Sequence, residues 1–255
     1  MSEATVQRDQ PAGVPPLALT GERTMPDVPA ENYWYRRHLA VYQWIAERCR
    51  GLDVVDMACG EGYGTEVLGR HARTVTGVDA NPEAHEHARL KYTNPGVRFV
   101  RDLVERHDEE CDAVVFLQTI EHVERPEEVL QHFRSMLRPG GAAYVSTPNL
   151  LTLAPPGAPK SDNPWHLREY RAREFRELCT SVFPRVELYG LFHARKLRAH
   201  ELALRAGWDR VHAALGITRP FYDRFTPAIA ASDFALRRQD LERALDFVAV
   251  LRPPA

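Results

Sequence analysis

Short apolar runs alternate along the chain with segments in which apolar residues recur at helical spacing. Helices are expected over 31–48, 62–71, 82–91 and 126–137, and again after residue 171. Repeated strand–helix–strand units of this length favour a parallel sheet. We therefore predict an α/β fold with a seven-stranded, mostly parallel sheet and helices on both of its faces. The seven expected strands are 53–58, 74–80, 97–100, 111–118, 142–147, 185–192 and 246–252.

Two stretches fall outside this alternation. Residues 1–30 contain five prolines and little apolar pattern, which predicts a flexible, mostly irregular arm before a single domain, residues 31–255. Residues 194–240 are rich in arginine and aromatic residues and are expected to form a helical insertion before the last strand. Long insertions at the carboxyl edge of such a sheet usually serve binding, so we expect this one to form part of a substrate pocket.

Composition and charge narrow the class of protein. The apolar fraction of 44% is ordinary for a globular protein, and no apolar run approaches the ~18 residues of a membrane helix. Four scattered cysteines without a C-x-x-C pair, and no signal peptide, make a cytoplasmic location the default expectation. The net charge of −2 argues against nucleic acid as a partner, although residues 166–224 carry 12 Lys and Arg against 7 Asp and Glu. That basic segment would either attract an anionic substrate or form solvent-facing amphipathic helices.

The turn after the first strand is rich in glycine. VVDMACGEGYG (54–64) places Gly60, Gly62 and Gly64 between a strand and a helix, where glycine lets the backbone approach a ligand closely. A dinucleotide-binding fingerprint would have its third glycine at position 65, which is Thr65 here. Nineteen residues beyond Gly60, Asp79 ends the second strand, where a carboxylate suits the two hydroxyls of a ribose.

A second polar group follows the fourth strand. In FLQTIEHVERP (116–126), an apolar strand is followed by Gln118, Glu121 and His122 within five residues. One interpretation is a surface turn before a helix. The other is a metal or proton-transfer site at the carboxyl edge of the sheet.

With these motifs, residues 31–150 resemble the class I S-adenosylmethionine-dependent methyltransferases, which implies a Rossmann-like fold and S-adenosylmethionine as cofactor. In that family the acid of the first strand and the glycines hold the methionine half. The acid ending the second strand holds the ribose, and residues after the third strand lie near the adenine. Two arginines of the first helix would reach the cofactor carboxylate or face solvent. The implied cofactor residues are Arg36, Arg37, Asp56, Ala58, Gly60, Gly62, Asp79, Ala80, Asp102, Leu103 and Gln118.

The segments IEHV, VSTPN and NPWHLREYRAREF resemble two groups within that family, the first of them metal-dependent. These are the 2′-O-methyltransferases of small-RNA 3′ ends and the quinone-biosynthesis O-methyltransferases, which share E-x-x-E-H. Here Gln118 replaces the first glutamate, which leaves one fewer charge for a cation. The resemblance implies Glu121, His122 and His166 as ligands of Mg²⁺ or Mn²⁺, or a histidine as general base.

A resemblance over nearly the whole chain concerns the acceptor. TGERTMPDVPAENYWYRRH (20–38), NPWHLRE and GLFHARKLR (190–198) are similar to actinobacterial sugar O-methyltransferases of the type that methylates methylmannose polysaccharide precursors. This implies an oligosaccharide or small-molecule acceptor, with catalysis by His122, Glu121, His166 and His193. The alternatives are an RNA end, a quinone-type small molecule, and a cofactor-binding scaffold without activity.

Trp165 could stack on a sugar face, and the remaining histidines, His38 and His87 among them, are expected at the surface. A monomer and a homodimer both remain open.

Overall fold

The computed structural model describes residues 7, 10–19, 23–155 and 157–254. These residues form an α/β fold built on one mixed sheet with the strand order β3-β2-β1-β4-β5-β8-β6-β7. Two described strands run opposite to the other six: β8, between β5 and β6, and β7, at the edge beside β6. The strands are β1 (Asp53–Met57), β2 (Thr74–Asp79), β3 (Val97–Arg101), β4 (Cys111–Leu117), β5 (Leu137–Pro148), β6 (Arg185–His193), β7 (Phe234–Arg237) and β8 (Asp246–Arg252).

The sheet has eight strands in the described chain, one more than the sequence predicts. The additional strand, β7, lies inside the stretch 194–240 that was expected to be helical. It has only four residues, FALR, which are too few to show a period of two. Its pairing with Gly190–His193 of β6, rather than any local pattern, makes it a strand.

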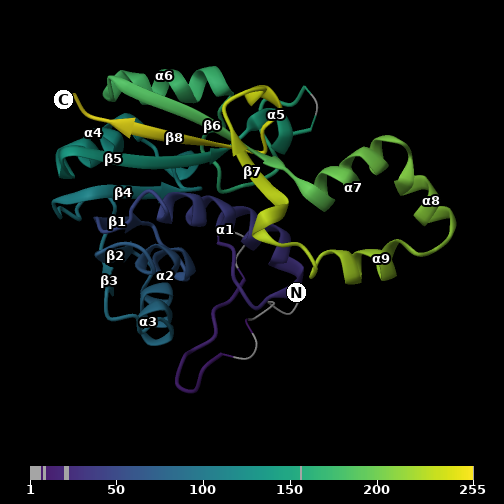
Figure 1. The fold of residues 1–255 in the computed structure, drawn as a ribbon, viewed down its shortest axis with the longest axis horizontal. Coiled ribbons are helices and arrows are strands. Elements are labelled where there is room, and N and C mark those ends of the chain that lie inside the picture. Colours follow the sequence, from purple (N-terminus) through teal and green to yellow (C-terminus); the bar gives the residue numbers. More distant parts are fainter. Residues whose placement is uncertain (1–6, 8–9, 20–22, 156, 255) are drawn as a thin grey trace.

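Helices cover both faces of the sheet, as predicted (Figure 1). Apolar side chains of α1 and α2 pack on one face and those of α4 and α6 on the other, which gives the molecule two hydrophobic cores. The helices are α1 (Asn32–Ala46), α2 (Tyr63–Gly69), α3 (Pro82–Lys91), α4 (Pro126–Met136), α5 (Leu150–Leu153), α6 (Ala172–Val182), α7 (Arg195–Arg205), α8 (Trp208–Ala214) and α9 (Thr218–Phe225).

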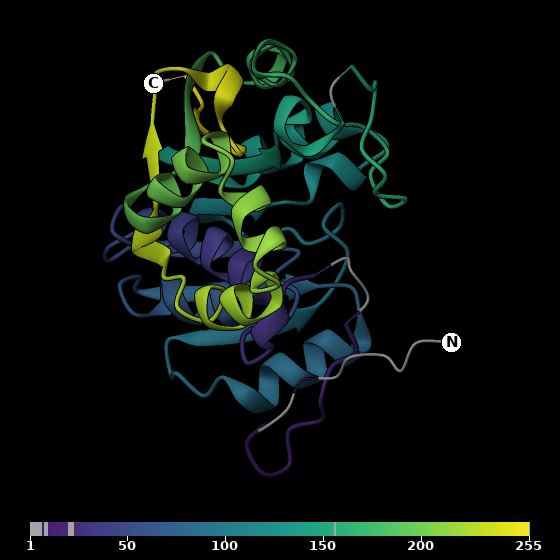
Figure 2. The ribbon, with the colours of Figure 1, turned by 90° about the vertical axis from the view of Figure 1, so that its right-hand side faces the viewer.

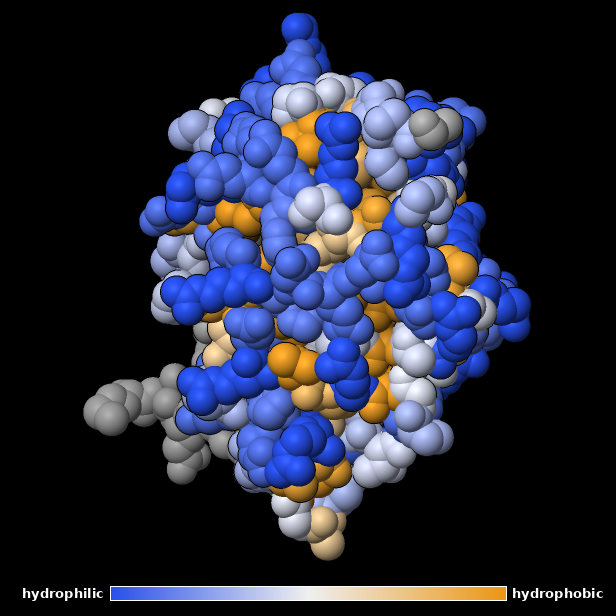
Figure 3. All heavy atoms as spheres, turned by 90° about the vertical axis from the view of Figure 1, so that its left-hand side faces the viewer, coloured by the Kyte–Doolittle hydropathy of each residue, from blue (hydrophilic) through white to orange (hydrophobic). Residues whose placement is uncertain are grey.

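The chain reverses its direction across the sheet between β1 and β4. From β1 it proceeds outward through β2 to β3, and it then returns to β4 on the opposite side of β1. Crevices for ligands form at such a point, outside the carboxyl ends of the strands. In Figure 1 these ends point toward the side from which α7 extends. The opposite edge presents mostly hydrophilic residues with scattered apolar ones (Figure 3).

Helices α7, α8 and α9 form an arm that extends from the body of the protein (Figures 1 and 2). The arm leaves from the end of β6 and returns to β7. Asn32 at the start of α1 holds its returning end, because the side-chain amide donates to the carbonyls of Thr226 at 2.8 Å and Ile229 at 3.0 Å.

Part of the proline-rich segment before α1 packs against the domain. Leu17, Met25 and Val28 are buried together. The carbonyl of Pro15 lies 2.7 Å from Nδ1 of His87, a histidine of α3 that was expected at the surface and is fully buried. Residues 1–6, 8, 9 and 20–22 of this segment lie outside the described residues. No described helix combines the length and the apolar character needed to cross a bilayer.

Candidate active site

The glycine-rich turn and the end of β2 are joined by one carboxylate. Asp79 accepts a hydrogen bond from the backbone N–H of Gly60 at 2.8 Å through Oδ2 and one from Asn81 at 2.9 Å through Oδ1. A carboxylate has about four acceptor positions, so these two bonds leave acceptor capacity for ligand hydroxyls. Asp79 therefore sets the shape of the turn and faces the cavity beside it.

The two glycines of the turn have different surroundings. A Cβ at Gly60 would meet no protein atom within 4 Å, and Gly60 lines the cavity, so a side chain there would point into open space. A Cβ at Gly62 would lie 2.8 Å from Cβ of Ala88 in α3. Both residues have positive φ angles, +57° and +95°. Gly60 thus keeps room for a ligand, whereas Gly62 lets α2 and α3 pack closely.

Asp56 does not line the cavity; it stabilises the glycine-rich turn through hydrogen bonds in the protein interior. Its carboxylate is fully buried and accepts hydrogen bonds from Thr65 Oγ1 at 2.7 Å and from the hydroxyl of Tyr42 at 3.3 Å. Burial raises the pKa of this carboxyl to about 7. Thr65, at the position of the third glycine in a dinucleotide-binding fingerprint, therefore fixes the acid of the first strand.

A first cavity of about 500 Å³ opens at the carboxyl ends of β1, β2 and β4. This volume suits a ligand of nucleoside size. Of the predicted cofactor residues, five line it directly: Ala58, Gly60, Asp79, Ala80 and Gln118. Leu103 lines a neighbouring cavity that shares Ala58, Asp79 and Ala80 with the first one.

A second cavity, of about 360 Å³, lies beside the first. Gln118 and His122 line both. Gln118 has a φ of +52°, and its side-chain amide donates to Oγ of Ser146 at 3.0 Å. This bond to the neighbouring strand β5 fixes the amide at the boundary between the two cavities.

Glu121 faces the second cavity from a buried position. The hydroxyl of Thr147 donates to its Oε2 at 3.1 Å, and burial raises the pKa of the carboxyl to about 8. The backbone carbonyl of Glu121 accepts hydrogen bonds from the N–H groups of Leu167 at 2.9 Å and Arg168 at 3.1 Å. These backbone bonds bring the loop that carries His166 to the end of β4.

His122 and His166 lie close together at the end of β4, although they are far apart in the sequence. Trp165, the residue before His166, is 43 positions from His122. Their ring centroids are 5.0 Å apart. Nδ1 of His122 donates to the carbonyl of Trp165 at 2.8 Å, and Nδ1 of His166 donates to Oε1 of Glu169 at 2.7 Å. Both assignments place the ring lone pair on Nε2, and in His166 this atom lies 3.0 Å from Nδ2 of Asn163. Ligand atoms of Glu121, His122 and His166 all lie within 4.8 Å of one another.

Four further predicted site residues do not line the first cavity. Arg37 is buried and forms an ion pair with Asp246, so its charge is already matched although it borders the second cavity. Arg36 donates to Oδ1 of Asn32 and lines neither cavity. Asp102 accepts from the N–H of Leu103 and also lines neither. His193, expected near the catalytic group, lies instead with Tyr33 and Glu201 where the arm begins.

The sequence interpretation missed part of the cavity walls. Arg23 and Thr24, from the segment expected to be flexible, line both cavities. His38 of α1 also lines both, and Thr24 Oγ1 lies 3.2 Å from its Nδ1. Burial lowers the pKa of His38 to about 4, so the imidazole is neutral at pH 7. No residue of the stretch 194–240 lines either cavity.

Comparisons with known proteins agree with this geometry. Residues 33–202 match the family model of a methyltransferase domain. The chain is 39% identical over 251 residues to a probable S-adenosylmethionine-dependent methyltransferase of Mycolicibacterium smegmatis, covering 93% of this chain and 96% of that one. A counterpart in Mycobacterium tuberculosis is 36% identical, covering 93% and 90%. A ubiquinone biosynthesis O-methyltransferase of Klebsiella pneumoniae is 35% identical over 115 residues, which cover 42% of this chain and 48% of that one.

Solved structures share the fold at low sequence identity. A Thermotoga maritima S-adenosylmethionine-dependent methyltransferase is 14% identical with a TM-score of 0.56, covering 87% of this chain and 93% of that one. The [4+2]-cyclase SpnF is 17% identical with a TM-score of 0.53, covering 100% and 89%. Because both likenesses concern the fold alone, they do not decide the acceptor. The matching family model, the relatives that align over nearly the whole chain and the turn held by Asp79 together show that this chain belongs to the class I S-adenosylmethionine-dependent methyltransferases.

Proposed function

We propose that the protein transfers the methyl group of S-adenosylmethionine to a hydroxyl of a carbohydrate, with a divalent cation bound by Glu121, His122 and His166. The observation that carries this proposal is the meeting of one carboxylate and two imidazoles beside Gln118, where the first and second cavities join. In this arrangement the first cavity holds the cofactor and the second holds the acceptor.

The residues of the first cavity fit the cofactor. Asp79 offers acceptor positions for the two ribose hydroxyls, and Gly60 leaves open space where any side chain would intrude. Ala80 and Leu103 present apolar surface beside Asp79, which suits an adenine ring. S-adenosylmethionine supplies a methyl group made electrophilic by a sulfonium. The task of the protein is then to align a hydroxyl oxygen with that carbon and to remove the hydroxyl proton.

Glu121, His122 and His166 would help to remove the hydroxyl proton of the acceptor. An alkyl hydroxyl has a pKa near that of water, about 15.7, and is a weak nucleophile until its proton is drawn away. As the oxygen–carbon bond forms, the bond from sulfur to the methyl carbon breaks. The hydroxyl proton must leave the oxygen at the same place. Ligand atoms of these three residues lie within 4.8 Å of one another, so a cation or that proton could be held between them. It would compete with the Asn163 amide, whose Nδ2 lies 3.0 Å from Nε2 of His166.

The donor set fits a divalent cation. Metal-binding histidines usually donate their second ring N–H to a carboxylate or a backbone carbonyl, as His166 does to Glu169 and His122 does to Trp165. A nearby cation would also favour the ionised form of Glu121, which is the form that binds a metal and which burial otherwise disfavours. Two nitrogen ligands favour Mn²⁺ or Zn²⁺ over Mg²⁺, which prefers oxygen. Such an ion would lower the pKa of a hydroxyl bound to it.

Trp165 supports a carbohydrate as acceptor. This residue is 50% exposed and lines the first cavity next to His122. Its carbonyl contacts His122, which lines both cavities, so an acceptor in the second cavity could reach the flat face of the indole, on which a sugar ring can stack. The resemblance of segments 20–38 and 190–198 to sugar O-methyltransferases points the same way. A flat aromatic acceptor is the second candidate, because a ubiquinone biosynthesis O-methyltransferase is 35% identical to this chain over 115 residues.

The test is an acceptor screen with isotope-labelled S-adenosylmethionine. The purified protein is incubated with oligosaccharides, phenols and short RNAs, each in the presence of Mn²⁺. We expect label in the oligosaccharide fraction, as an ether that resists mild base. The His122→Ala variant should lose at least a hundredfold in rate, whereas His85→Ala on α3, outside both cavities, should keep wild-type activity.

Three outcomes would contradict the proposal in different ways. If only phenols are labelled, the acceptor is an aromatic molecule rather than a carbohydrate. If only RNA is labelled, neither a carbohydrate nor an aromatic molecule is the acceptor. A His122→Ala variant within a few-fold of the wild type would leave the end of β4 as an ordinary surface turn. Binding of S-adenosylhomocysteine, measured separately, shows whether a loss of activity comes from the cofactor cavity.

A further inference from the structure

A groove of about 680 Å³ lies outside the two cavities of the proposed methyl-transfer site. It runs along the base of the arm, between α7, the β6–β7 edge and the turn before β8. Leu151 of α5 lines this groove, and Leu153, two residues later, lines the second cavity. The short helix α5 therefore separates the groove from the place where His166 lies.

The groove carries guanidinium groups that have no hydrogen-bond or ion-pair partner among the described residues. Arg198, Arg237 and Arg243 line it, and none of them has a side-chain hydrogen bond or ion pair with another described residue. The groove also contains Glu201, which Arg205 already pairs, and one further acid, Glu242. The uncompensated charge of the groove is therefore positive.

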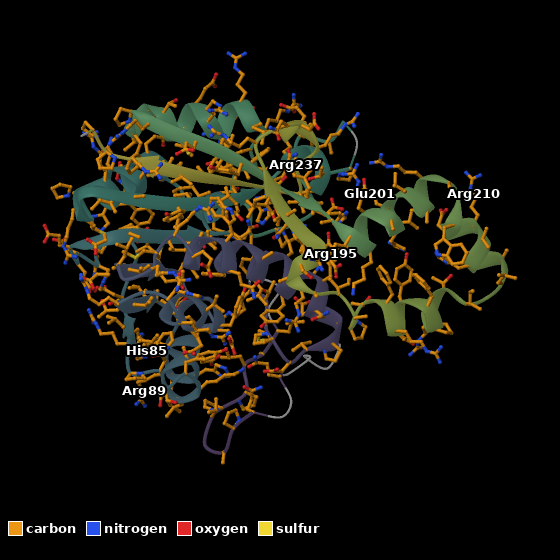
Figure 4. All side chains as sticks on the ribbon, viewed as in Figure 1. His85, Arg89, Arg195, Glu201, Arg210 and Arg237 are labelled. Carbon is orange, nitrogen blue, oxygen red and sulfur yellow. The ribbon has the colours of Figure 1, made fainter. Side chains whose placement is uncertain are left out.

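Arg237 is the most informative of these residues. Its guanidinium carbon lies 3.8 Å from the centroid of the Phe192 ring, and its Nε is buried without a hydrogen-bond acceptor among the described residues. A buried charged donor without an acceptor is costly, and most such groups in native proteins have a partner. Figure 4 shows Arg237 on β7 and Glu201 on α7, both at the base of the arm.

Apolar side chains complete the groove. Leu202 on α7 is 55% exposed and Leu151 on α5 is 45% exposed, and both line it. Exposed leucines beside unpaired arginines suit a ligand that has an anionic head next to an apolar portion. A fully hydrated anion would leave the leucines exposed, and a neutral apolar ligand would leave the arginines unpaired.

We propose that this groove is a binding site for an amphiphilic anion, a phosphate or carboxylate head attached to an aliphatic portion. The head would accept hydrogen bonds from Arg237 and Arg243, and the aliphatic portion would cover Leu202 and Leu151. The site is independent of methyl transfer, because its residues are distinct from those that line the first and second cavities.

Hexyl phosphate, hexanoate and hexanol are suitable probes for calorimetry with the full-length protein. They share one chain and differ in the head group. We expect at least one of the two anions to bind with a Kd below 1 mM and hexanol not to bind. The anion that binds more tightly identifies the head group. The double variant Arg237→Gln/Arg243→Gln should weaken that binding at least tenfold, while Arg210→Gln on α8, farther out on the arm (Figure 4), should leave it unchanged.

Affinity of every variant for S-adenosylhomocysteine should equal that of the wild type, which shows that each is folded. If the double variant fails this control, Arg243→Gln alone replaces it, because Arg243 is exposed and has no side-chain hydrogen bond or ion pair with a described residue. A threefold or greater loss of anion binding is expected of that single variant. The proposal is overturned if neither anion binds at millimolar concentration, if hexanol binds equally well, or if Arg210→Gln weakens binding as much as the groove variants.

Discussion

Arg37 of α1 and Asp246, the first residue of β8, form a buried ion pair although they are 209 positions apart. Nε of Arg37 donates to Oδ2 of Asp246 at 2.6 Å, and Nη2 donates to Oδ1 and to the carbonyl of Leu245. The pair joins the first helix to the last strand next to the second cavity. Its position explains why Arg37 supports the wall of that cavity rather than offering its charge to a ligand.

Arg37→Met should lower the free energy of unfolding by about 3–5 kcal/mol, because it leaves the carboxylate of Asp246 buried without a partner. Urea denaturation measures this change. The matched control is Arg73→Met, which breaks the exposed pair with Asp53 and should cost less than about 1 kcal/mol. The double variant Arg37→Met/Asp246→Asn should recover part of the loss. Equal costs for the buried and the exposed pair would contradict this account.

Asp79→Ala should weaken the binding of S-adenosylhomocysteine by thirtyfold or more. The ribose hydroxyls would lose a charged acceptor worth about 1.5–3 kcal/mol, and Gly60 would lose the bond that shapes its turn. Calorimetry gives the affinity directly. Asp102→Ala, an acid of the neighbouring loop that lines neither cavity, should stay within about twofold of the wild type. The reverse order of effects would show that Asp102 holds the nucleoside.

Alanine at the two turn glycines should have separable effects. Gly60→Ala should cost about 1 kcal/mol of stability because of its positive φ, but it should weaken cofactor binding at least tenfold because the methyl group enters the cavity. Gly62→Ala should cost about 1–3 kcal/mol more, since its Cβ would overlap Ala88. Thermal unfolding with and without S-adenosylhomocysteine measures both quantities. Identical behaviour of the two variants would refute the division of roles.

Asp56 should make stability depend on pH. The folded state keeps this carboxyl protonated up to a pH of about 7, whereas an unfolded chain releases the proton near 3.8. The contribution of Asp56 is therefore fully present below pH 3.8 and is lost as the pH rises to 7, by at most roughly 4 kcal/mol. Asp56→Asn cannot ionise, so its stability relative to the wild type should increase from pH 4.5 to pH 8. Urea denaturation at both pH values that gives the same difference would disprove the prediction.

The cation proposal predicts a direct binding signal. The apo protein should bind Mn²⁺ or Zn²⁺ in calorimetry with one site per chain, and Glu121→Gln should weaken this by at least tenfold. Chelator should abolish methyl transfer, and Mn²⁺ should restore it. His132→Ala, a histidine of α4 outside the second cavity, serves as the control. Full activity after chelation, with no metal uptake, would leave a histidine as the sole proton acceptor.

The sequence predicts well what short-range pattern and chain order determine. Alternating apolar runs and helical periods predict seven of the eight described strands, and Gly60 and Asp79 follow from their places at strand ends. Glu121 and His122 share one turn, so their closeness is also a local property. His166 could be named only through resemblance, because its position depends on the backbone bonds from Leu167 and Arg168 to Glu121.

The features that the sequence did not predict depend on contacts between residues that are far apart in the sequence. No local pattern shows that Arg37 pairs with a residue of the last strand, or that Thr24 and His38 would line a cavity together. His193 ends a strand at the same edge of the sheet as His122. The antiparallel strand β8 and the parallel strand β5 lie between β6 and β4, however, so the two histidines do not meet.

The short β7 also bears on the solubility of the protein. It pairs only with Gly190–His193, so the outer side of the remaining residues of β6 is not covered by any described strand. An exposed strand edge is a template for pairing between chains and hence for aggregation. Here Glu187, in the uncovered part, pairs with Arg238 and Arg252. A second chain that docked at this edge would have to displace or desolvate these charges, so the ion pairs act as a barrier to intermolecular strand addition.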